Sequence, residues 1–388
     1  MPKRIAVLGS TGSIGRNTLE VIEHLGPDYR AVALTAHRQA DELLNQARRH
    51  KPAAVALTDD QVDARIVEAI RALGATVYVG ERGLVEMVGR EDVDLVVAAI
   101  VGAAGLPAVL AAVRAGKPIA LANKESLVVA GSLVIPEARR RNVPILPVDS
   151  EHSAVFQAIR CGRREEIKRV ILTASGGPFR TASREQIERA TLADALNHPT
   201  WRMGNKVTID SATMFNKGLE LIEACWLFDL SPEQVEVVVH PESVVHSMVE
   251  FVDGSTIAQL SPPDMRTPIQ YALTYPDRVA GVGRTMNWRE RVALNFEPPD
   301  LDRFPALRLA YEVAGTGGTS GAVMNAANEV AVESFVAGKI PFGEISRTVE
   351  LTIRRHRVQR GASLDDLVQA DAWARSEAAA IVAALNST

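Results

Sequence analysis

Carboxylates, hydroxyls and an imidazole occur close together in the segment PVDSEHSA, residues 147–154. An apolar run, residues 143–148, predicts a buried strand that ends where this cluster begins. Asp149 and Glu151 are two positions apart, so both carboxylates can reach one cation at the strand end. Oxygen ligands without thiolates or several histidines are typical of Mg²⁺ or Mn²⁺. The segment therefore predicts two ligands of a hard divalent ion.

A third carboxylate comes from SATMFNKGLELIEACWLF, residues 211–228, whose spacing predicts a helix. Asn216 and Glu220 are four apart and share one helix face, with Lys217 beside them. Such a polar group in an otherwise apolar helix favours Glu220 as the third metal ligand. The alternative is that Glu220 is a solvated surface acid, like Glu223.

Glycines at fixed spacing mark the segment VLGSTGSIGRNTLEVI, residues 7–22. Gly9, Gly12 and Gly15 lie between a predicted strand and a predicted helix, where backbone N–H groups can approach a pyrophosphate at the helix N-terminus. The pattern is G-x-x-G-x-x-G rather than the commoner G-x-G-x-x-G. It predicts a dinucleotide site, and a purely structural glycine turn is the alternative.

The second predicted strand, AVALTA at residues 31–36, indicates which dinucleotide is bound. An NAD site usually has an acid at this strand end for the ribose 2′-OH, whereas NADP needs a cation for its extra phosphate. Here the strand is followed by His37 and Arg38, and Arg38 can form a bidentate pair with a phosphate. NADP(H) is favoured over NAD(H), with a solvated surface arginine as the alternative.

Two other segments offer groups for an anionic substrate. LANKESL, residues 121–127, follows a predicted strand, so Lys124 lies on the same sheet edge as Asp149 and could neutralise a developing enolate or alkoxide. A lysine that starts a helix and points to water is the alternative. TASGGPF, residues 173–179, ends a strand with Ser175 and two glycines, a pattern typical of a backbone N–H nest for anions.

A lid is predicted at NHPTWRMGNK, residues 197–206. The segment combines His198, Trp201 and Met203 but is too polar and too rich in turn residues for a core helix. Its tryptophan could exclude water from a closed site, although packing onto a neighbouring domain is the alternative. His240 and His246 lie in strand-like runs and are interpreted as structural histidines.

The elements that position these groups follow from the hydrophobic pattern. Up to about residue 148, seven short apolar runs alternate with amphipathic stretches, which predicts βαβ units on a parallel sheet. Residues 150–284 predict a mixed α+β region with a hairpin turn at Asp253-Gly254. Prolines between 292 and 305 indicate a linker, and helical spacing follows. The predicted fold is α/β, with a Rossmann-like parallel-sheet domain at 1–148, a catalytic α+β metal and substrate domain at 149–290 with a flap near 197–206, a linker at 291–310 and a helical bundle at 311–388.

Composition narrows the possible partners. A formal net charge of −4 and a pI near 6.1 argue against a nucleic-acid partner, which would leave a basic footprint. The two cysteines, Cys161 and Cys225, are too few and too far apart for a disulfide framework, which fits a reducing, cytoplasmic location. The N-terminus lacks the features of a signal peptide. The uncharged run 95–113 is broken by Gly102, Gly105 and Pro107, so a strand, a turn and a helix explain it better than a membrane span.

Seven motifs occur in order along the chain: GSTGSIG, ANKESL, DSEHSA, TASGGPF, HPTWRMG, DSATMFNKGLE and NAANE. Together they resemble the 1-deoxy-D-xylulose 5-phosphate reductoisomerase family over essentially the whole chain. The resemblance implies an NADP-dependent oxidoreductase that forms 2-C-methyl-D-erythritol 4-phosphate for isoprenoid synthesis. It implies a retro-aldol and aldol isomerisation to a branched aldehyde, then hydride transfer from NADPH, with Mg²⁺ or Mn²⁺ required.

The resemblance also implies roles for individual residues. The implied metal ligands are Asp149, Glu151 and Glu220, and Lys124 joins them as a catalytic residue. The implied substrate-binding residues are Lys124, Ser150, Glu151, Ser175, His198, Trp201, Met203, Ser211, Asn216, Lys217 and Glu220, with Ser175, Ser211, Asn216 and Lys217 at the phosphate. The implied NADPH contacts are Thr11, Gly12, Ser13, Ile14, Asn123, Glu125 and Gly204, and Arg38 keeps the family's cation.

One departure from the family pattern follows the second strand. The family usually has Gly, then Lys or Arg, then Asn, whereas this chain has His37, Arg38 and Gln39. The glycine and asparagine contacts are therefore not transferred to His37 and Gln39. The resemblance further implies a homodimer formed largely through the central sheet. The alternatives are a related reductase that acts on another sugar phosphate, and a non-catalytic NADP-binding regulator.

Overall fold

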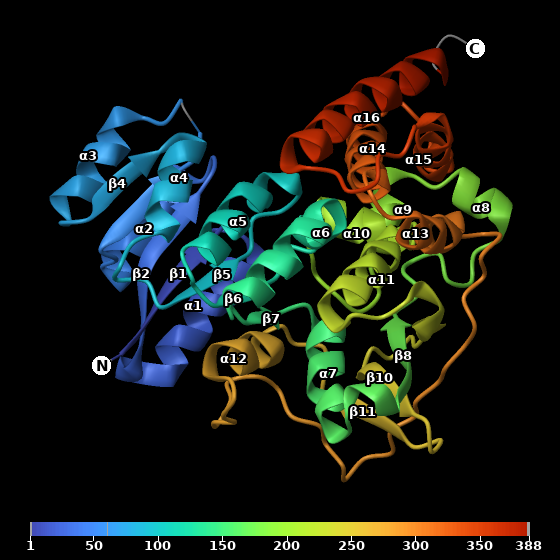
Figure 1. Ribbon diagram of the computed structural model, residues 1–388, viewed down its shortest axis with the longest axis horizontal. Coiled ribbons are helices and arrows are strands. Elements are labelled where there is room, and N and C mark those ends of the chain that lie inside the picture. The colour runs from blue at the N-terminus through green and yellow to red at the C-terminus, as the bar shows by residue number, and fades with distance from the viewer. Residues whose placement is uncertain (1, 60, 386–388) are drawn as a thin grey trace. The chain divides into compact units, whose positions relative to one another are not determined.

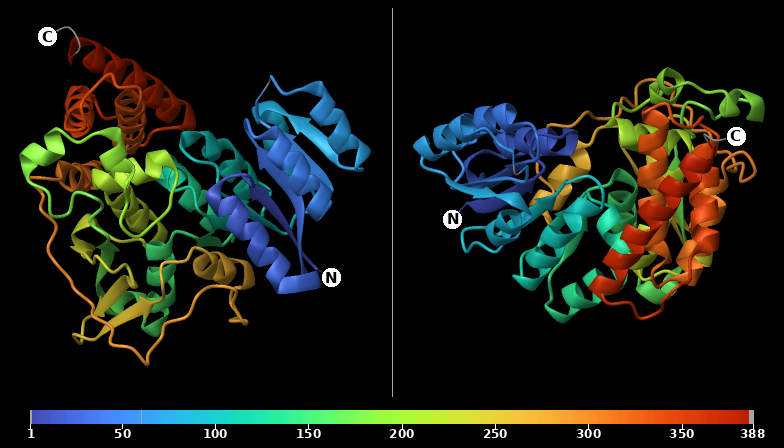
Figure 2. Two further views of the ribbon diagram at one scale, coloured as in Figure 1. Left: turned by 180° about the vertical axis from the view of Figure 1, so that it is seen from behind. Right: turned by 90° about the horizontal axis from the view of Figure 1, so that it is seen from above.

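The computed structural model describes residues 2–59 and 61–385 (Figures 1 and 2). Its strands are β1 (Lys3–Leu8), β2 (Tyr29–Ala36), β3 (Ala54–Leu57), β4 (Thr76–Val79), β5 (Leu95–Ala98), β6 (Ile119–Leu121), β7 (Ile145–Pro147), β8 (Ile167–Ala174), β9 (Val235–Val239), β10 (Val245–Phe251) and β11 (Thr256–Leu260). Its α-helices are α1 (Ser13–Leu25), α2 (Ala40–His50), α3 (Ala64–Ala72), α4 (Gly80–Val88), α5 (Leu106–Arg114), α6 (Glu125–Arg140), α7 (Ser150–Ala158), α8 (Arg184–Glu188), α9 (Leu192–Leu196), α10 (Asn205–Ala212), α11 (Phe215–Phe228), α12 (Arg266–Thr274), α13 (Pro305–Thr316), α14 (Ser320–Val336), α15 (Glu344–Arg355) and α16 (Leu364–Leu385).

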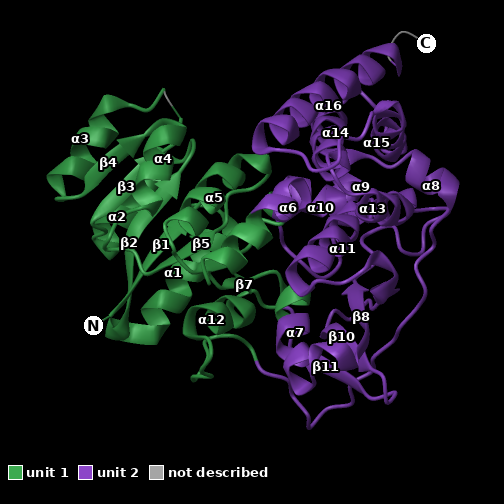
Figure 3. Ribbon diagram, in the orientation of Figure 1, with its two compact units in different colours: residues 1–126, 134–153, 264–284 green, residues 127–133, 154–263, 285–388 purple. Residues whose placement is uncertain are grey.

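The chain forms two compact units, coloured separately in Figure 3. Unit 1 comprises residues 1–126, 134–153 and 264–284, and unit 2 comprises residues 127–133, 154–263 and 285–388. Both units join segments that are distant in sequence. The predicted four-part division therefore stays a prediction, and its residues 1, 60 and 386–388 lie outside the described residues.

Unit 1 contains a seven-stranded sheet in the order β4-β3-β2-β1-β5-β6-β7. All neighbouring strands pair in parallel, so the seven strands predicted from the apolar runs are confirmed. Every residue of β3, β5 and β6 is buried, as expected when helices cover both faces of a parallel sheet. The strand order reverses between β1 and β5, and ligands of open α/β sheets bind outside the carboxyl ends of strands at such a point.

Close backbone packing shapes the turn from β1 into α1. Gly9 turns the chain with a φ of 77°, a conformation that favours glycine. A Cβ atom on Gly15 would overlap the Gly9 carbonyl oxygen, so α1 can start this close to β1 only with glycine there. Gly12 is exposed, and only the Gly9 carbonyl lies within 4 Å of where its Cβ would be. Two of the three glycines thus serve the turn itself, while Gly12 faces outward.

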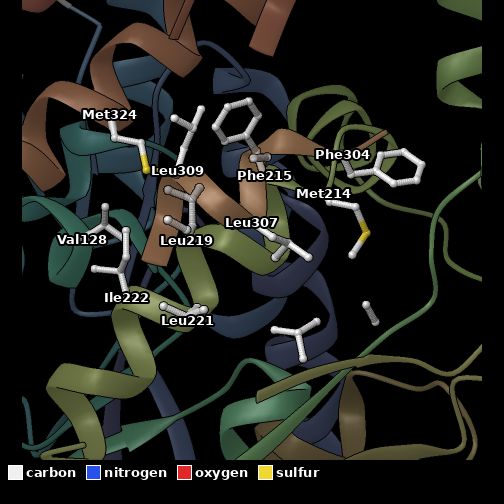
Figure 4. Packing of buried hydrophobic residues seen from close by; sticks show 14 of the residues in the cluster. Val128, Met214, Phe215, Leu219, Leu221, Ile222, Phe304, Leu307, Leu309 and Met324 are labelled. Carbon is white, nitrogen blue, oxygen red and sulfur yellow. The ribbon is translucent and has the colours of Figure 1, made fainter. Parts of the chain in front are cut away.

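Unit 2 combines a four-stranded sheet, in the order β11-β10-β8-β9, with a group of helices. β10 and β11 form the predicted hairpin around Asp253 and Gly254. In the hydrophobic core, Phe215 and Leu219 of α11 lie among Leu307 and Leu309 of α13 and Met324 of α14 (Figure 4). Helices α14, α15 and α16 pack together and form the predicted C-terminal helical group (Figure 2).

Two details differ from the sequence prediction. The helix predicted from residue 211 begins instead at Phe215, because Met214 has a left-handed φ of 65° that separates α11 from α10. Helix α13 begins at Pro305, which confirms the helical spacing predicted after residue 305 but places residues 305–310 of the predicted linker in a helix. The uncharged run 95–113 forms β5, a glycine turn and α5, as predicted. No helix in the described ranges is long and apolar enough to cross a membrane.

The packing of α14 against α6 gives a test of the unit 2 core. In the Gly321→Ala variant, the new Cβ would overlap the Val128 carbonyl oxygen. We expect the free energy of unfolding to fall by about 1–3 kcal/mol, because a backbone atom cannot move aside without disturbing its helix. Chemical denaturation measures this change.

The matched control is Gly315→Ala in α13, where nothing lies within 4 Å of the added methyl group. We expect this control to leave stability unchanged or to raise it by up to about 1 kcal/mol, because alanine favours the helix. Equal stability of the two variants would contradict the described packing.

Candidate functional site

The N-terminus of α1 presents backbone amides to solvent. Gly12 is its N-cap residue and provides no side-chain cap, and Gly12 and Ser13 are exposed. Within the described chain, no protein group accepts a hydrogen bond from the amide of Ser13 or Ile14. Unpaired amides at a helix start favour an anion. This end of α1 therefore fits a pyrophosphate, whereas Thr11 is buried beside it.

The loop between β2 and α2 carries the predicted cofactor cation. His37, Arg38 and Gln39 are all exposed. His37 Nδ1 lies 3.1 Å from Thr58 Oγ1, just beyond β3. In the part of the chain that the structure describes, the Arg38 guanidinium makes no hydrogen bond or ion pair. Arg38 is therefore available to an external anion, and its phosphate-binding role stays a prediction.

Asn123 organises the carboxyl ends of β5 and β6. Its side-chain amide donates to the carbonyl oxygens of Ile100 at 2.6 Å and Gly102 at 2.9 Å, and to Glu125 Oε2 at 3.0 Å. Asn123 is 2% exposed and Glu125 is 5% exposed. These two predicted cofactor residues therefore shape the strand ends of the sheet from a buried position.

Lys124 and Asp149 meet at the ends of the adjacent strands β6 and β7. Lys124 Nζ lies 2.9 Å from Asp149 Oδ2, and both side chains are largely buried. Lys124 thus precedes a helix, as expected, but it does not point into water. On the first turn of α7, Ser150 Oγ donates to Glu151 Oε2 at 2.6 Å. Unit 1 thus gathers two carboxylates, one ammonium and one hydroxyl at this edge of its sheet.

Glu220 lies in unit 2 on α11 and is 1% exposed. Asn216 Nδ2 donates to its Oε1 at 2.5 Å, and Lys217 forms an ion pair with its Oε2. Glu220 is therefore not a solvated surface acid. The interpretation of Glu223 as a solvated surface acid was also wrong, because Glu223 is equally buried. Both residues are buried because the unit 2 core encloses α11.

His198 connects two hydroxyls predicted to hold a phosphate. Its Nε2 lies 2.9 Å from Ser175 Oγ and 3.1 Å from Ser211 Oγ. Its Nδ1 accepts hydrogen bonds from the Thr200 amide at 3.2 Å and the Trp201 amide at 2.9 Å. Since Nδ1 is an acceptor, Nε2 carries the proton of the neutral ring and can donate to the hydroxyls. Burial lowers the pKa of His198, which favours this neutral form.

A glycine pair lies beside the same hydroxyls. Gly176 and Gly177 have φ values of 80° and 65°, and the Gly177 amide donates to Ser175 Oγ at 3.2 Å. A Cβ on Gly177 would lie 2.7 Å from the Ser211 carbonyl oxygen. Only glycine therefore fits between the end of β8 and α10. Unit 2 thus groups hydroxyl, amide and imidazole donors of the kind that bind phosphates.

The predicted flap is a loop between α9 and α10. Trp201 and Met203 are half-buried, and the Trp201 ring centroid lies 6.3 Å from that of His246. Gly204 is exposed and is the N-cap residue of α10. His246 and His240 are buried, and each is hydrogen-bonded to backbone groups. This environment agrees with their interpretation as structural histidines.

Asp210, which is 2% exposed, was not predicted as a site residue. Lys206 Nζ lies 2.7 Å from its Oδ2, and Asn328 Nδ2 donates to its Oδ1 at 2.8 Å. The first contact lies within α10, which carries Ser211, and the second joins α10 to α14. The spacing of Lys206 and Asp210, four apart in an amphipathic stretch, is the signal that could have identified this pair.

Comparison with known proteins identifies the family. Models described as 1-deoxy-D-xylulose 5-phosphate reductoisomerase and its C-terminal domains match residues 5–131, 145–228 and 260–377. The 1-deoxy-D-xylulose 5-phosphate reductoisomerase of Heliobacterium modesticaldum is 52% identical over 377 residues, which cover 97% of this chain and 96% of the relative. The chain belongs to the 1-deoxy-D-xylulose 5-phosphate reductoisomerase family. The enzyme of that name from Trichlorobacter lovleyi is 48% identical, with 97% of this chain and 96% of the relative covered.

Solved structures of this reductoisomerase family share the fold. A crystal structure of DOX-P reductoisomerase in complex with NADPH, fosmidomycin and magnesium has a TM-score of 0.92 and 43% identity, and 99% of each chain is covered. The 1-deoxy-D-xylulose 5-phosphate reductoisomerase from Zymomonas mobilis in complex with NADPH has a TM-score of 0.92 and 45% identity, over 98% of this chain and 99% of that one.

The hydrogen bonds of His198 predict its tautomer. We expect the neutral ring to carry its proton on Nε2, because backbone amides occupy Nδ1. Long-range proton–nitrogen NMR of the imidazole at neutral pH distinguishes the tautomers. A ring protonated on Nδ1 would contradict the described site.

The lowered pKa of His198 also predicts a pH dependence of stability. The unfolded chain takes up this proton near pH 6.5, above the folded pKa. The stability associated with the neutral ring is therefore present above about pH 6.5 and is lost as the pH falls toward the folded pKa. We expect denaturation midpoints of the wild type and His198→Gln to converge as the pH falls through this window. A constant difference would overturn the prediction.

Proposed function

We propose that this chain converts 1-deoxy-D-xylulose 5-phosphate to 2-C-methyl-D-erythritol 4-phosphate in an NADPH- and divalent-metal-dependent reaction. The observation that carries the proposal is full-length membership of the reductoisomerase family. The donor groups in each unit support it, since the carboxylates suit a hard cation and the hydroxyl and imidazole groups suit a phosphate.

Most residues of the proposed NADPH site lie in the predicted domain 1–148, and Gly204 comes from the predicted flap. The free amides of Ser13 and Ile14 would hold the pyrophosphate, and Thr11 and Gly12 would border it. The cation of Arg38 suits the 2′-phosphate. Asn123, Glu125 and Gly204 complete the proposed contacts. Bound NADPH supplies the hydride, and the chain positions it and excludes competing reactions.

The proposed metal ligands are Asp149, Glu151 and Glu220. An ion held by these carboxylates, Mg²⁺ or Mn²⁺, would act as a Lewis acid toward adjacent substrate oxygens. The Lys124 ammonium, which lies beside Asp149, would stabilise negative charge as the C3–C4 bond breaks. Ser150 would orient Glu151 through its hydrogen bond and would contact the substrate.

The proposed phosphate site is the donor group of unit 2. His198 would donate through Nε2, and Ser175 and Ser211 would donate through their hydroxyls. Lys217 and Asn216 would place an ammonium and an amide at the same phosphate. Trp201 and Met203 would close over the bound substrate and exclude water, as expected for a flap.

The Glu220 assignment is tested by Glu220→Gln with Glu223→Gln as the matched control. Both carboxylates lie on α11 and are 1% exposed, so both substitutions remove a buried charge from one helix. We expect Glu220→Gln to lower turnover more than about 100-fold while NADPH still binds, because a direct metal ligand is lost. The assay follows NADPH oxidation with 1-deoxy-D-xylulose 5-phosphate before and after EDTA treatment.

Full turnover by Glu220→Gln, or an equal loss of turnover in both variants, would contradict the assignment of Glu220 as a metal ligand. Wild-type protein that binds NADPH but does not oxidise it with this substrate would favour another sugar phosphate or a regulatory role. Activity that survives EDTA would contradict the metal requirement.

We also propose a cytoplasmic homodimer. The support is strand β11, which forms one edge of the unit 2 sheet, whereas Val239 of β9 at the other edge pairs with Glu297. An open edge can pair with a second chain. Sedimentation equilibrium is expected to give twice the chain mass of 41.8 kDa. A monomer at micromolar concentration would overturn this part of the proposal.

A further inference from the structure

Arg16 is a second arginine near the proposed cofactor cation, and neither the glycine pattern nor the proposed function assigns it a role. It lies on the first turn of α1, one position after Gly15. Its guanidinium extends to the start of α2, where Nη2 donates to Gln39 Oε1 at 3.2 Å and Nε lies 3.6 Å from Glu42 Oε1. Arg16 therefore connects the helix that would hold the pyrophosphate with the loop that carries Arg38.

Two hydrogen bonds fix the ends of that loop and leave its centre accessible. His37 is held to Thr58 at one end, and Gln39 is held to Arg16 at the other. Arg38 lies between them, is exposed, and has no hydrogen-bond or ion-pair partner within the described chain. Fixed neighbours reduce the conformational entropy that Arg38 and Arg16 would lose on binding an anion.

The ion pair of Arg16 with Glu42 is too weak to explain why an arginine occupies this position. Its side chain is 57% exposed and that of Glu42 is 40% exposed, and 3.6 Å is a long separation for such a pair. An exposed pair of this kind contributes about 0–1 kcal/mol. The guanidinium also keeps donors beyond the one that bonds Gln39, and a planar fork of N–H groups matches phosphate oxygens.

We propose that Arg16 and Arg38 together bind the 2′-phosphate of NADPH, with Gln39 as the positioning residue that holds Arg16 beside the loop. This inference rests on the proposed function, because it assumes that the α1 N-terminus holds the pyrophosphate. From there the adenosine ribose would extend toward the end of β2, and its 2′-phosphate would reach the β2–α2 loop. Where the family has glycine and asparagine, this chain thus has His37, which is hydrogen-bonded to Thr58, and Gln39, which accepts a hydrogen bond from Arg16.

The test is direct cofactor binding, which does not require turnover. Kd values for NADPH and NADH are measured by calorimetry for the wild type, Arg16→Gln, Gln39→Ala and the control Arg48→Gln. Arg48 is an exposed arginine near the other end of α2, with one long hydrogen bond to Asn45 at 3.4 Å. Its removal changes the net charge by the same amount without touching the loop.

We expect Arg16→Gln to weaken NADPH binding about tenfold, equivalent to about 1.4 kcal/mol, and to leave NADH binding unchanged. Gln39→Ala is expected to act in the same direction with a smaller effect. Arg48→Gln should change neither Kd. Salt should weaken NADPH binding less steeply in Arg16→Gln than in the wild type, since one phosphate contact is missing.

An equal loss of NADPH and NADH affinity in Arg16→Gln would overturn the inference, because it would assign Arg16 to the shape of α1 and not to the extra phosphate. Unchanged affinity for both cofactors would overturn it as well. Wild-type protein that does not prefer NADPH to NADH would instead refute the proposed cofactor, and that outcome is distinguishable because it appears before any substitution is made.

Discussion

The structure of unit 2 depends on the cost of burying charge in α11. Glu220 is almost completely removed from water inside a helix that also contributes Phe215 and Leu219 to the core (Figure 4). An unpaired carboxylate there would cost several kcal/mol, so both of its oxygens are bonded, to Asn216 and to Lys217. These three polar groups are fixed relative to one another by helical spacing. A well-packed helix is therefore what keeps them in a constant geometry.

In unit 1 the main constraint is the close approach of backbone segments, and not the burial of a charged side chain. The sheet brings the ends of β1, β5, β6 and β7 to one edge, and Gly9 and Gly15 let α1 begin directly behind β1. Asn123 then joins the loops after β5 and β6 with hydrogen bonds from one amide. Because this framework is buried, the polar groups at its edge are held by backbone positions. Amides and charged side chains at this edge can then bind a ligand without a large loss of conformational entropy.

Much of this organisation could be predicted from the sequence. The seven strands of unit 1, the hairpin at Asp253 and the C-terminal helices followed from hydrophobic period and turn residues. The break at Met214 could not be predicted, because a left-handed methionine is an exception to propensity that tertiary packing imposes. The burial of Glu223 was missed for a similar reason. Its helix is apolar on more than one face, and an acid there is only recognised as buried once α13 and α14 are in place.

Candidate residues were easier to name than their partners. Asp149, Lys124 and Glu220 were chosen by type and position, but the direct pairing of Lys124 with Asp149 depends on the register of β6 and β7. The contacts of Arg16 with Gln39 and of Asp210 with Asn328 were missed because each joins elements that are distant in sequence. The spacing of residues along one helix or strand predicts contacts within that element. Contacts between elements can be identified only once the three-dimensional arrangement of the elements is known.

The two sides of the His198 ring link a proton to the shape of a loop. The lone pair on Nδ1 can accept the Thr200 and Trp201 amides or a proton, but not both. An ordered loop therefore lowers the basicity of the ring, and a protonated ring releases the loop backbone. The other nitrogen, Nε2, faces Ser175 and Ser211. A ligand bound at these hydroxyls that changes the proton affinity of the ring therefore also changes the stability of the ordered backbone at residues 200–201. Loop closure and proton affinity are thus two measures of one equilibrium.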